Sequence, residues 1–305
     1  MLSANLLCML PPHRAAAQQP VPQPAPCTQV LLKNSVTVNG LVFRNYQGQS
    51  IDDAGCVKVF RNGEVIFQLA DPDVLQYSLG QPANRQYGIP PVLNGTDVTG
   101  RGHPDMIVTA WTGGAHCCSR HYIFELEPKF RLLARLEDAD DDLAHFADLK
   151  HDRHYYYLAA DWTFAYWQAS FADSPSVAVI LKFVPDNDSG SFHLALDRME
   201  KPAPTPNQWK TAVAMGRGAF GENNPVSGGI GSELWGQMLD WIYSGHSDYA
   251  WKLFDRAWPA DKPGKDAFLG DFCSVLKTSP YWPDLESTVK EMPLTCAQAK
   301  PRRDD

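Results

Sequence analysis

The chain has 305 residues, a formal net charge of −8 at pH 7 and a hydrophobic content of 44%. Lysine and arginine are scattered along it, which excludes a basic surface for nucleic acid or for an anionic membrane as the main partner. The apolar content is enough for a sizeable core in one large domain or two ordinary ones.

The first 17 residues are expected to be a secretory signal peptide. An apolar stretch at residues 5–10 is followed by small residues, with Ala15 and Ala17 at the positions that precede a cleavage site. The usual basic opening is missing, so a disordered cytoplasmic tail is the alternative. Residues 18–27 form a disordered lead rich in proline and glutamine. We therefore expect a periplasmic or extracellular protein without stable membrane insertion, because no other apolar run approaches the ~20 residues of a spanning helix.

One of the seven cysteines, Cys8, lies in this leader. An even number of cysteines in the remaining exported chain favours disulfides over free thiols. Proximity in the sequence favours two pairings and leaves the adjacent pair either as a bridge or as two thiols. The cysteines concerned are Cys27 with Cys56, Cys273 with Cys296, and Cys117 beside Cys118.

The segment after the lead carries the alternation of apolar and polar residues that is typical of β-strands. Residues 29–43 form one stretch with an Asn-Gly turn at 39–40, which indicates a tight hairpin. Residues 56–69 form a second hairpin, and residues 72–91 are rich in turn residues and are expected to be irregular. The chain therefore begins as antiparallel β-structure.

Two related units follow, at about residues 94–136 and 145–196. Each opens with an Asp-rich turn, Asp97 to Asp105 in the first and Asp148 to Tyr156 in the second, and continues into β-strands. Repeats of this kind are typical of propeller blades or stacked sheets. Two units are too few to close a propeller, so residues 28–200 are expected to form an open β domain.

The character of the sequence changes after residue 200. The proline-rich start of residues 201–231 predicts a linker. Residues 232–243 and 247–258 then show helical spacing of apolar side chains, and further helices are expected at 265–276 and 285–290. The predicted fold class is α+β: mainly antiparallel β-structure with two propeller-blade-like units, followed by a small helical domain over residues 232–296.

The loop that opens the first unit resembles the calcium-binding loop of FG-GAP repeats, the blade motif of integrin α-subunits and of many exported bacterial proteins. That pattern is Asp-x-Asp/Asn-x-Asp-Gly-x-x-Asp. Asp97 and Asp105 match its first and ninth positions, whereas Thr99 and Arg101 stand at the third and fifth. The resemblance implies a calcium-type cation loop.

In the second unit Asp148 and Asp152 match the first and fifth positions, but Lys150 takes the third and Tyr156 the ninth. Ca²⁺ prefers six to eight oxygen ligands with several carboxylates, and a cation inside the loop repels it. We therefore expect that Arg101 and Lys150 replace the ion and neutralise the aspartates themselves. Calcium binding by the same loops is the alternative, and no cofactor is otherwise expected.

The sequence Gly-Gly-Ala-His-Cys-Cys at residues 113–118 resembles a signature of an uncharacterised family of exported bacterial proteins. His116, Cys117 and Cys118 have the imidazole and thiolate groups that suit copper(I) or zinc, so a metal or redox site is one interpretation. Adjacent cysteines seldom ligate one ion together, and in an exported protein they oxidise. A closed turn that shapes the loop is the other interpretation.

Aromatic residues gather directly after Asp161, at positions 162, 164, 166 and 167. Such side chains stack on sugar rings in some proteins and fill the core in most. The acidic run at residues 137–142 is expected to be a solvated loop. Because no catalytic motif is complete, the leading hypothesis is an exported non-enzymatic binding or scaffold protein whose partner is a protein or a glycan. An exported hydrolase acting on glycans, and a metal-binding or redox protein, are the alternatives.

Overall fold

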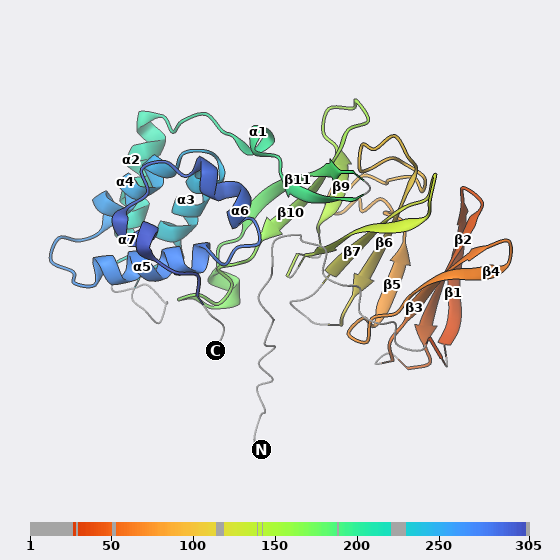
Figure 1. Cartoon of the computed structure of the whole chain (residues 1–305). Helices are drawn as coiled ribbons and strands as arrows, with labels where there is room; N and C mark the ends of the chain where they lie inside the picture. Colours follow the sequence, from red (N-terminus) through yellow and green to blue (C-terminus); the bar gives the residue numbers. More distant parts are fainter. Residues whose placement is uncertain are drawn as a thin grey trace, which may run out of the picture. The chain divides into compact units, whose positions relative to one another are not determined.

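The computed structural model describes residues 27–28, 30–50, 53–113, 119–138, 140–141, 143–187, 189–220 and 230–302. These residues form two compact units (Figure 1). The β unit contains the described residues of Ala16–Trp162 and Ala178–Arg198, and the helical unit contains those of Thr163–Val177 and Met199–Asp305. Each unit is built around its own core and is described separately.

The β unit consists of three four-stranded antiparallel sheets, and in each sheet the strands are neighbours in chain order. The first sheet comprises β1 (Val30–Val38), β2 (Leu41–Gly48), β3 (Cys56–Arg61) and β4 (Glu64–Leu69). The second comprises β5 (Gln76–Leu79), β6 (Asp105–Trp111), β7 (Ser119–Glu125) and β8 (Arg131–Glu137). The third comprises β9 (His145–Asp148), β10 (Tyr155–Asp161), β11 (Val177–Asp186) and β12 (Ser189–Leu194).

The hairpins of the first sheet follow from their turn residues. Asn39 and Gly40 join β1 to β2 with φ values of 46° and 72°, and Asn62 and Gly63 join β3 to β4 with 52° and 87°. Two successive positive φ values are what a two-residue type I′ hairpin requires, and asparagine followed by glycine adopts them at least cost. Both predicted hairpins are therefore confirmed.

The first and second sheets enclose an aromatic core. Phe124 of β7 is fully buried, stacks on Phe130 at 5.6 Å between ring centroids, and meets Phe43 and Phe67 edge to face at 5.9 and 5.3 Å. Tyr122 and Phe124 both belong to this core, since alternate residues of a strand share one face. Because rings from both sheets are buried in one core, the first and second sheets stabilise each other.

The other face of β7 packs against the third sheet. His121 packs edge to face on Tyr157 of β10, with 5.3 Å between ring centroids. Near the same boundary the Gln81 side-chain amide donates to the carbonyl of Phe146 at 2.8 Å and accepts its N–H at 2.7 Å. The side chain of Gln81 thus makes the pair of hydrogen bonds that a neighbouring strand would make, and it links the second and third sheets.

The predicted antiparallel β region is confirmed and consists of three sheets. The two hairpins predicted at its start pair with each other to form the first of them. β5 lies in the stretch 72–91 that was expected to be irregular, because its four residues are too short to show a pattern. Among the described residues the sheets do not form a closed ring of blades.

The C-terminal helical region is also confirmed (Figure 1). Its main helices are α2 (Pro206–Gly218), α3 (Ser232–Tyr243), α4 (Ser247–Ala257) and α5 (Lys265–Leu276). The short ones are α6 (Trp282–Leu285) and α7 (Leu294–Gln298), with 3₁₀ turns η1 (Phe171–Asp173) and η2 (Glu286–Thr288). The remaining short helix, α1 (Leu196–Met199), begins in the last residues of the β unit.

Helix α2 occupies much of the segment 201–231 that was expected to be a linker. Thr205 and Gln208 form a capping box at its start, and Pro206 stands in the first turn, where its missing N–H is harmless. Gly216 allows α2 to approach α4 closely, because a Cβ at that position would lie 3.0 Å from Ala257. The prolines that suggested a linker therefore mark the beginning of a helix.

Two disulfides lie among the described residues, and they are the two pairings favoured from the sequence. Cys27 and Cys56 lie 5.9 Å apart between Cα atoms in the β unit, and Cys273 and Cys296 lie 5.2 Å apart and join α5 to α7. Such bonds persist in oxidising compartments. In the part of the chain that the structure describes, no helix has the length and apolar character needed to span a membrane.

The aromatic core between the sheets gives a stability prediction. Phe124→Ala removes a fully buried ring and should lower the free energy of unfolding by about 3–5 kcal/mol. Val65→Ala, at an exposed position of β4, is the control and should change it by less than about 0.5 kcal/mol. Urea unfolding measures both. A small effect of Phe124→Ala would mean that the ring is not in a packed core.

Candidate functional site

The loop Asp97–Asp105 is the last part of the connection from β5 to β6 and is organised by the carboxylate at its beginning. Asp97 Oδ1 accepts the backbone N–H of Arg101 at 3.1 Å, and Oδ2 accepts that of Gly102 at 2.7 Å. Gly100 and Gly102 have φ values of 70° and 80°, a conformation that glycine adopts without strain. The loop is therefore a wrapped turn held by its own amides.

Asp105, at the start of β6, closes the loop from the other end. Its Oδ2 accepts the backbone N–H of Val98 and of Thr99, both at 3.0 Å, and the hydroxyl of Thr99 at 2.9 Å. The residue is only 2% exposed, and its Oδ1 is buried without a hydrogen-bond partner. Burial raises the pKa of Asp105 from 3.8 to about 7, although the donors from Thr99 and Val98 oppose this.

The loop between β9 and β10 repeats the first half of this geometry. Asp148 Oδ1 accepts the N–H of Asp152 at 3.1 Å, and Oδ2 accepts that of Arg153 at 2.9 Å. His151 and Arg153 have φ values of 58° and 67°, at the positions that correspond to the two glycines of the first loop. Lys150 is exposed. Both loops thus share one backbone turn at the same place in two four-stranded sheets.

The guanidinium of Arg101 does not replace an ion between Asp97 and Asp105, so that prediction is wrong. Its Nε donates to Glu125 Oε1 at 2.8 Å, and its Nη1 donates to the carbonyl of Ser189 at 3.0 Å. The physical reason is that the loop amides and Thr99 already serve the aspartates, whereas Glu125 is a fully buried carboxylate that needs compensation.

Arg131 completes this contact on the second oxygen of the carboxylate. Its Nε donates to Glu125 Oε2 at 2.7 Å. We call Arg101, Glu125 and Arg131 the Glu125 clamp. The clamp joins the loop to β7 and to the first residue of β8. The hydrogen bond from Arg101 to the carbonyl of Ser189 also links it to β12 of the third sheet.

The residues of the first loop do not fit a calcium ion. The loop has only two carboxylates, Asp97 and Asp105, and three of their four oxygens already accept hydrogen bonds from the protein, whereas Ca²⁺ prefers six to eight oxygen ligands with several carboxylates. Within the described residues no group of three or more histidine, cysteine, aspartate or glutamate side chains is placed to hold a metal ion.

A buried polar cluster that was not predicted from the sequence lies between β7, the end of β8 and β10. His121 Nδ1 lies 2.7 Å from Asp138 Oδ2, and the Tyr157 hydroxyl lies 2.5 Å from Asp138 Oδ1 and 2.7 Å from His121 Nδ1. Burial raises the pKa of Asp138, which the contacts with His121 and Tyr157 counteract. All three residues are buried, so this arrangement bonds two sheets together instead of facing a substrate.

On the opposite face of β7, Arg120 lies between two carboxylates. It donates to Asp71 Oδ2 and to Glu137 Oε2, both at 2.8 Å, and Arg135 also pairs with Glu137. Glu137 and Asp138 belong to the acidic run that was expected to be a solvated loop. That expectation is wrong for these two positions, since Glu137 is ion-paired with Arg120 and Arg135, and Asp138 is buried.

The aromatic stretch after Asp161 divides between core and surface. Phe164 and Trp167 are buried in the helical unit, where Trp167 packs on Trp235 at 5.1 Å between ring centroids. Tyr166 remains 64% exposed. His116, Cys117 and Cys118 lie outside the described residues.

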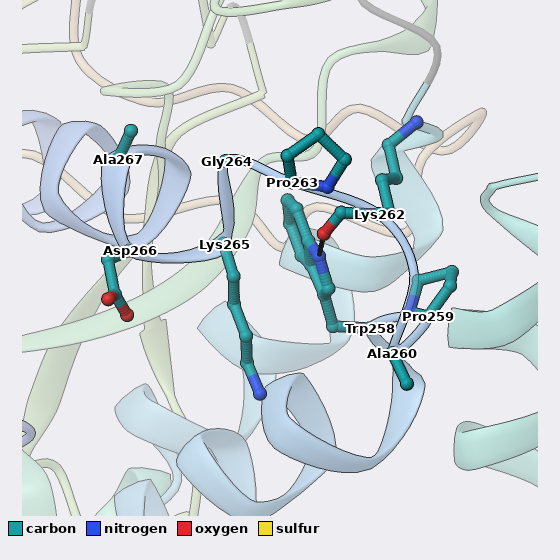
Figure 2. Close-up of a pocket in the computed structure, with 9 residues that line it drawn as sticks. All are labelled: Trp258, Pro259, Ala260, Lys262, Pro263, Gly264, Lys265, Asp266 and Ala267. Carbon is teal, nitrogen blue, oxygen red and sulfur yellow. Dashed lines mark hydrogen bonds between the residues drawn. The ribbon is translucent and has the colours of Figure 1, made fainter.

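A hollow of about 440 Å³ lies in the helical unit, along residues 258–267 before and at the start of α5 (Figure 2). The indole N–H of Trp258 donates to the carbonyl of Lys262 at 2.8 Å and closes this turn. Figure 2 shows the side chains of Lys262 and Lys265 extending in different directions, and Lys265 pairs with Asp255 at 2.6 Å. The two lysine side chains therefore do not form a shared positive surface in the hollow.

A comparison of the chain with protein-family models, with curated proteins and with solved structures found no match.

The Glu125 clamp predicts the effect of losing its arginine. Arg101→Ala leaves the buried carboxylate with one guanidinium and removes the contact with Ser189, so stability should fall by about 1–3 kcal/mol. Lys150→Ala, an exposed cation of the second loop, is the control and should stay within about 0.5 kcal/mol. Thermal melting with EDTA and with millimolar Ca²⁺ should give equal midpoints for the wild type. A midpoint that rises with Ca²⁺ would contradict our account of the loop.

The raised pKa of Asp105 predicts a pH dependence of stability. Between pH 3.8 and about 7 the folded carboxyl holds a proton that the unfolded chain releases, so its contribution to stability declines as pH rises through this window. Asp105→Asn has no such proton. The stability of the wild type relative to the variant should therefore be higher at pH 5 than at pH 8, as measured by urea unfolding at both values. An equal difference at the two pH values would show that Asp105 does not titrate in this range.

Proposed function

We propose that the chain is an exported, non-enzymatic binding or scaffold protein with degenerate FG-GAP-like loops on blade-like sheets. The observation that carries this proposal is the common backbone turn of the two loops. Asp97 and Asp148 each accept the amides four and five residues later, and each turn follows the first strand of a four-stranded sheet. This relation supports two repeated units of the FG-GAP kind.

The connections that carry these turns also present apolar side chains to solvent. Leu93 is 79% exposed, Tyr87 55% and Leu149 40%. Each lies between the first and second strand of its sheet. A connection that is already ordered loses little conformational entropy when a partner binds, which makes these side chains suitable contacts for a protein surface. We call Tyr87, Leu93 and Leu149 the loop surface.

The candidate groups for catalysis favour this proposal over a hydrolase. Asp161, Phe164 and Trp167, which a glycan hydrolase would need at a cleft, are buried. His121 and Asp138 are buried as well. A nucleophile or general base must reach the atom it attacks or the proton it removes, and these positions are closed to a substrate.

Export is supported by the two disulfides, which are retained in an oxidising compartment such as the periplasm or the cell exterior. A metal-binding or redox role for His116, Cys117 and Cys118 is a separate proposal. Metal analysis of the purified protein tests that role, and a stoichiometric amount of copper or zinc would support it.

The loop surface predicts which substitutions abolish binding. A tagged chain purified from its exporting cells should retain one stoichiometric protein partner, identified by mass spectrometry. Leu93→Asp and Leu149→Asp should each lower its recovery at least tenfold, because a buried unpaired charge costs more than 1.4 kcal/mol at an interface. Leu294→Asp, at a position 71% exposed in the helical unit, is the matched control and should change nothing. Equal recovery with all three variants would rule out the loop surface.

A further inference from the structure

Tyr166 is held at the surface of the helical unit in a backbone conformation that tyrosine seldom adopts. Its φ is 61°, and that of Gln168 is 57°. Positive φ is uncommon for residues other than glycine, and a bulky residue keeps it only where the surroundings impose it. Two such residues within three positions place this segment among the strained parts of the chain. Strain of this kind is concentrated at binding and catalytic sites.

A chain of hydrogen bonds imposes the conformation. The N–H of Tyr166 donates to Ser174 Oγ at 2.9 Å, and that hydroxyl donates to the carbonyl of Ser170 at 2.8 Å. The hydroxyl of Ser170 in turn donates to Asp173 Oδ2 at 2.6 Å. These contacts fix the backbone of the loop from Tyr166 to Ser174 and do not involve the tyrosine ring, which is 64% exposed.

The base of the loop is anchored in the helical core. Trp167 donates its indole N–H to Asp271 Oδ2 at 2.9 Å, and Phe164 packs on Phe272 at 5.0 Å between ring centroids. Gly236 of α3 allows the loop to lie close to the helix, because a Cβ there would be 3.2 Å from Pro175. The residues on both sides of Tyr166 are therefore rigid.

The exposed ring has one aromatic neighbour. It is tilted by 39° against the half-buried ring of Phe171, at 5.5 Å between centroids. In the same loop Gln168, Ser170 and Asp173 are exposed, and Asp173 accepts a hydrogen bond from Ser170. The loop therefore offers an aromatic ring, an amide and a carboxylate.

We propose that Tyr166 is the stacking platform of a carbohydrate-binding site in the helical unit. The apolar face of a pyranose ring would lie on the tyrosine, and its hydroxyls would bond to the side chains of Gln168 and Asp173. The site is separate from the loop surface of the β unit, and no covalent step is involved.

The proposal is tested by titration calorimetry of the full chain with three soluble hexasaccharides: chitohexaose, cellohexaose and maltohexaose. At least one should bind. Tyr166→Asn should weaken that binding at least tenfold, and asparagine is chosen because it tolerates positive φ and so keeps the loop backbone. Tyr166→Phe should bind within threefold of the wild type, since the stacking face is retained.

Trp111→Ala is the matched control, because Trp111 is an aromatic residue 39% exposed on β6 of the β unit and belongs to neither proposed site. It should leave sugar binding unchanged. The proposal is overturned if none of the three sugars binds, or if Tyr166→Asn binds as the wild type does while its melting midpoint is unchanged. Neither result bears on the protein partner of the loop surface, so the two proposals fail independently.

Discussion

The β unit depends on the compensation of one buried carboxylate. Glu125 is fully buried, and an ionised carboxylate without partners would cost several kcal/mol there. Arg101 and Arg131 supply that compensation, one on each oxygen. Because Arg101 lies in a loop and also donates to the carbonyl of Ser189, the same guanidinium fixes the loop on β7 and connects the second sheet to the third.

This contact is one of several that make β7 a strand buried on both faces. Tyr122 and Phe124 enter the aromatic core toward the first sheet, while His121 and Glu125 bond toward the third. A shift of one residue in the pairing of β7 would exchange the two sets and place charges in the aromatic core. The polar groups therefore help to specify the register together with the apolar ones.

The parts of this fold that the sequence predicted are those with local signals. The hairpins follow from Asn-Gly turns, and the relation of the two loops follows from the positions of Asp97 and Asp148. The partner of Arg101 could not be predicted, because Glu125 is 24 positions away on another strand and no local pattern links the two. The same limit hid the contact between His121 and Asp138.

Two predictions were wrong because they were based on local composition alone. The acidic run suggested a solvated loop, yet Glu137 and Asp138 are ordered by Arg120 and by His121, which only the pairing of strands brings near. The prolines near residue 201 suggested a linker, although Pro206 stands at a position where helices accept proline. The partners of Glu137 and Asp138 are brought near them only by the folded sheet. The place of Pro206 in the first turn of α2 is likewise defined only once the helix is known.

The connection between the first and second strand distinguishes the three sheets. In the first sheet it is the two-residue turn at Asn39, whereas in the second and third it is a longer loop that an aspartate wraps. The longest connection contains further order, since Asn84 and Ile89 exchange both backbone hydrogen bonds at 3.0 and 2.9 Å. Because these loops are fixed by backbone donors, their exposed side chains are free to vary without loss of the turn. In the scaffold that we propose, substitutions at the loops would change the partner while the sheets remain the same.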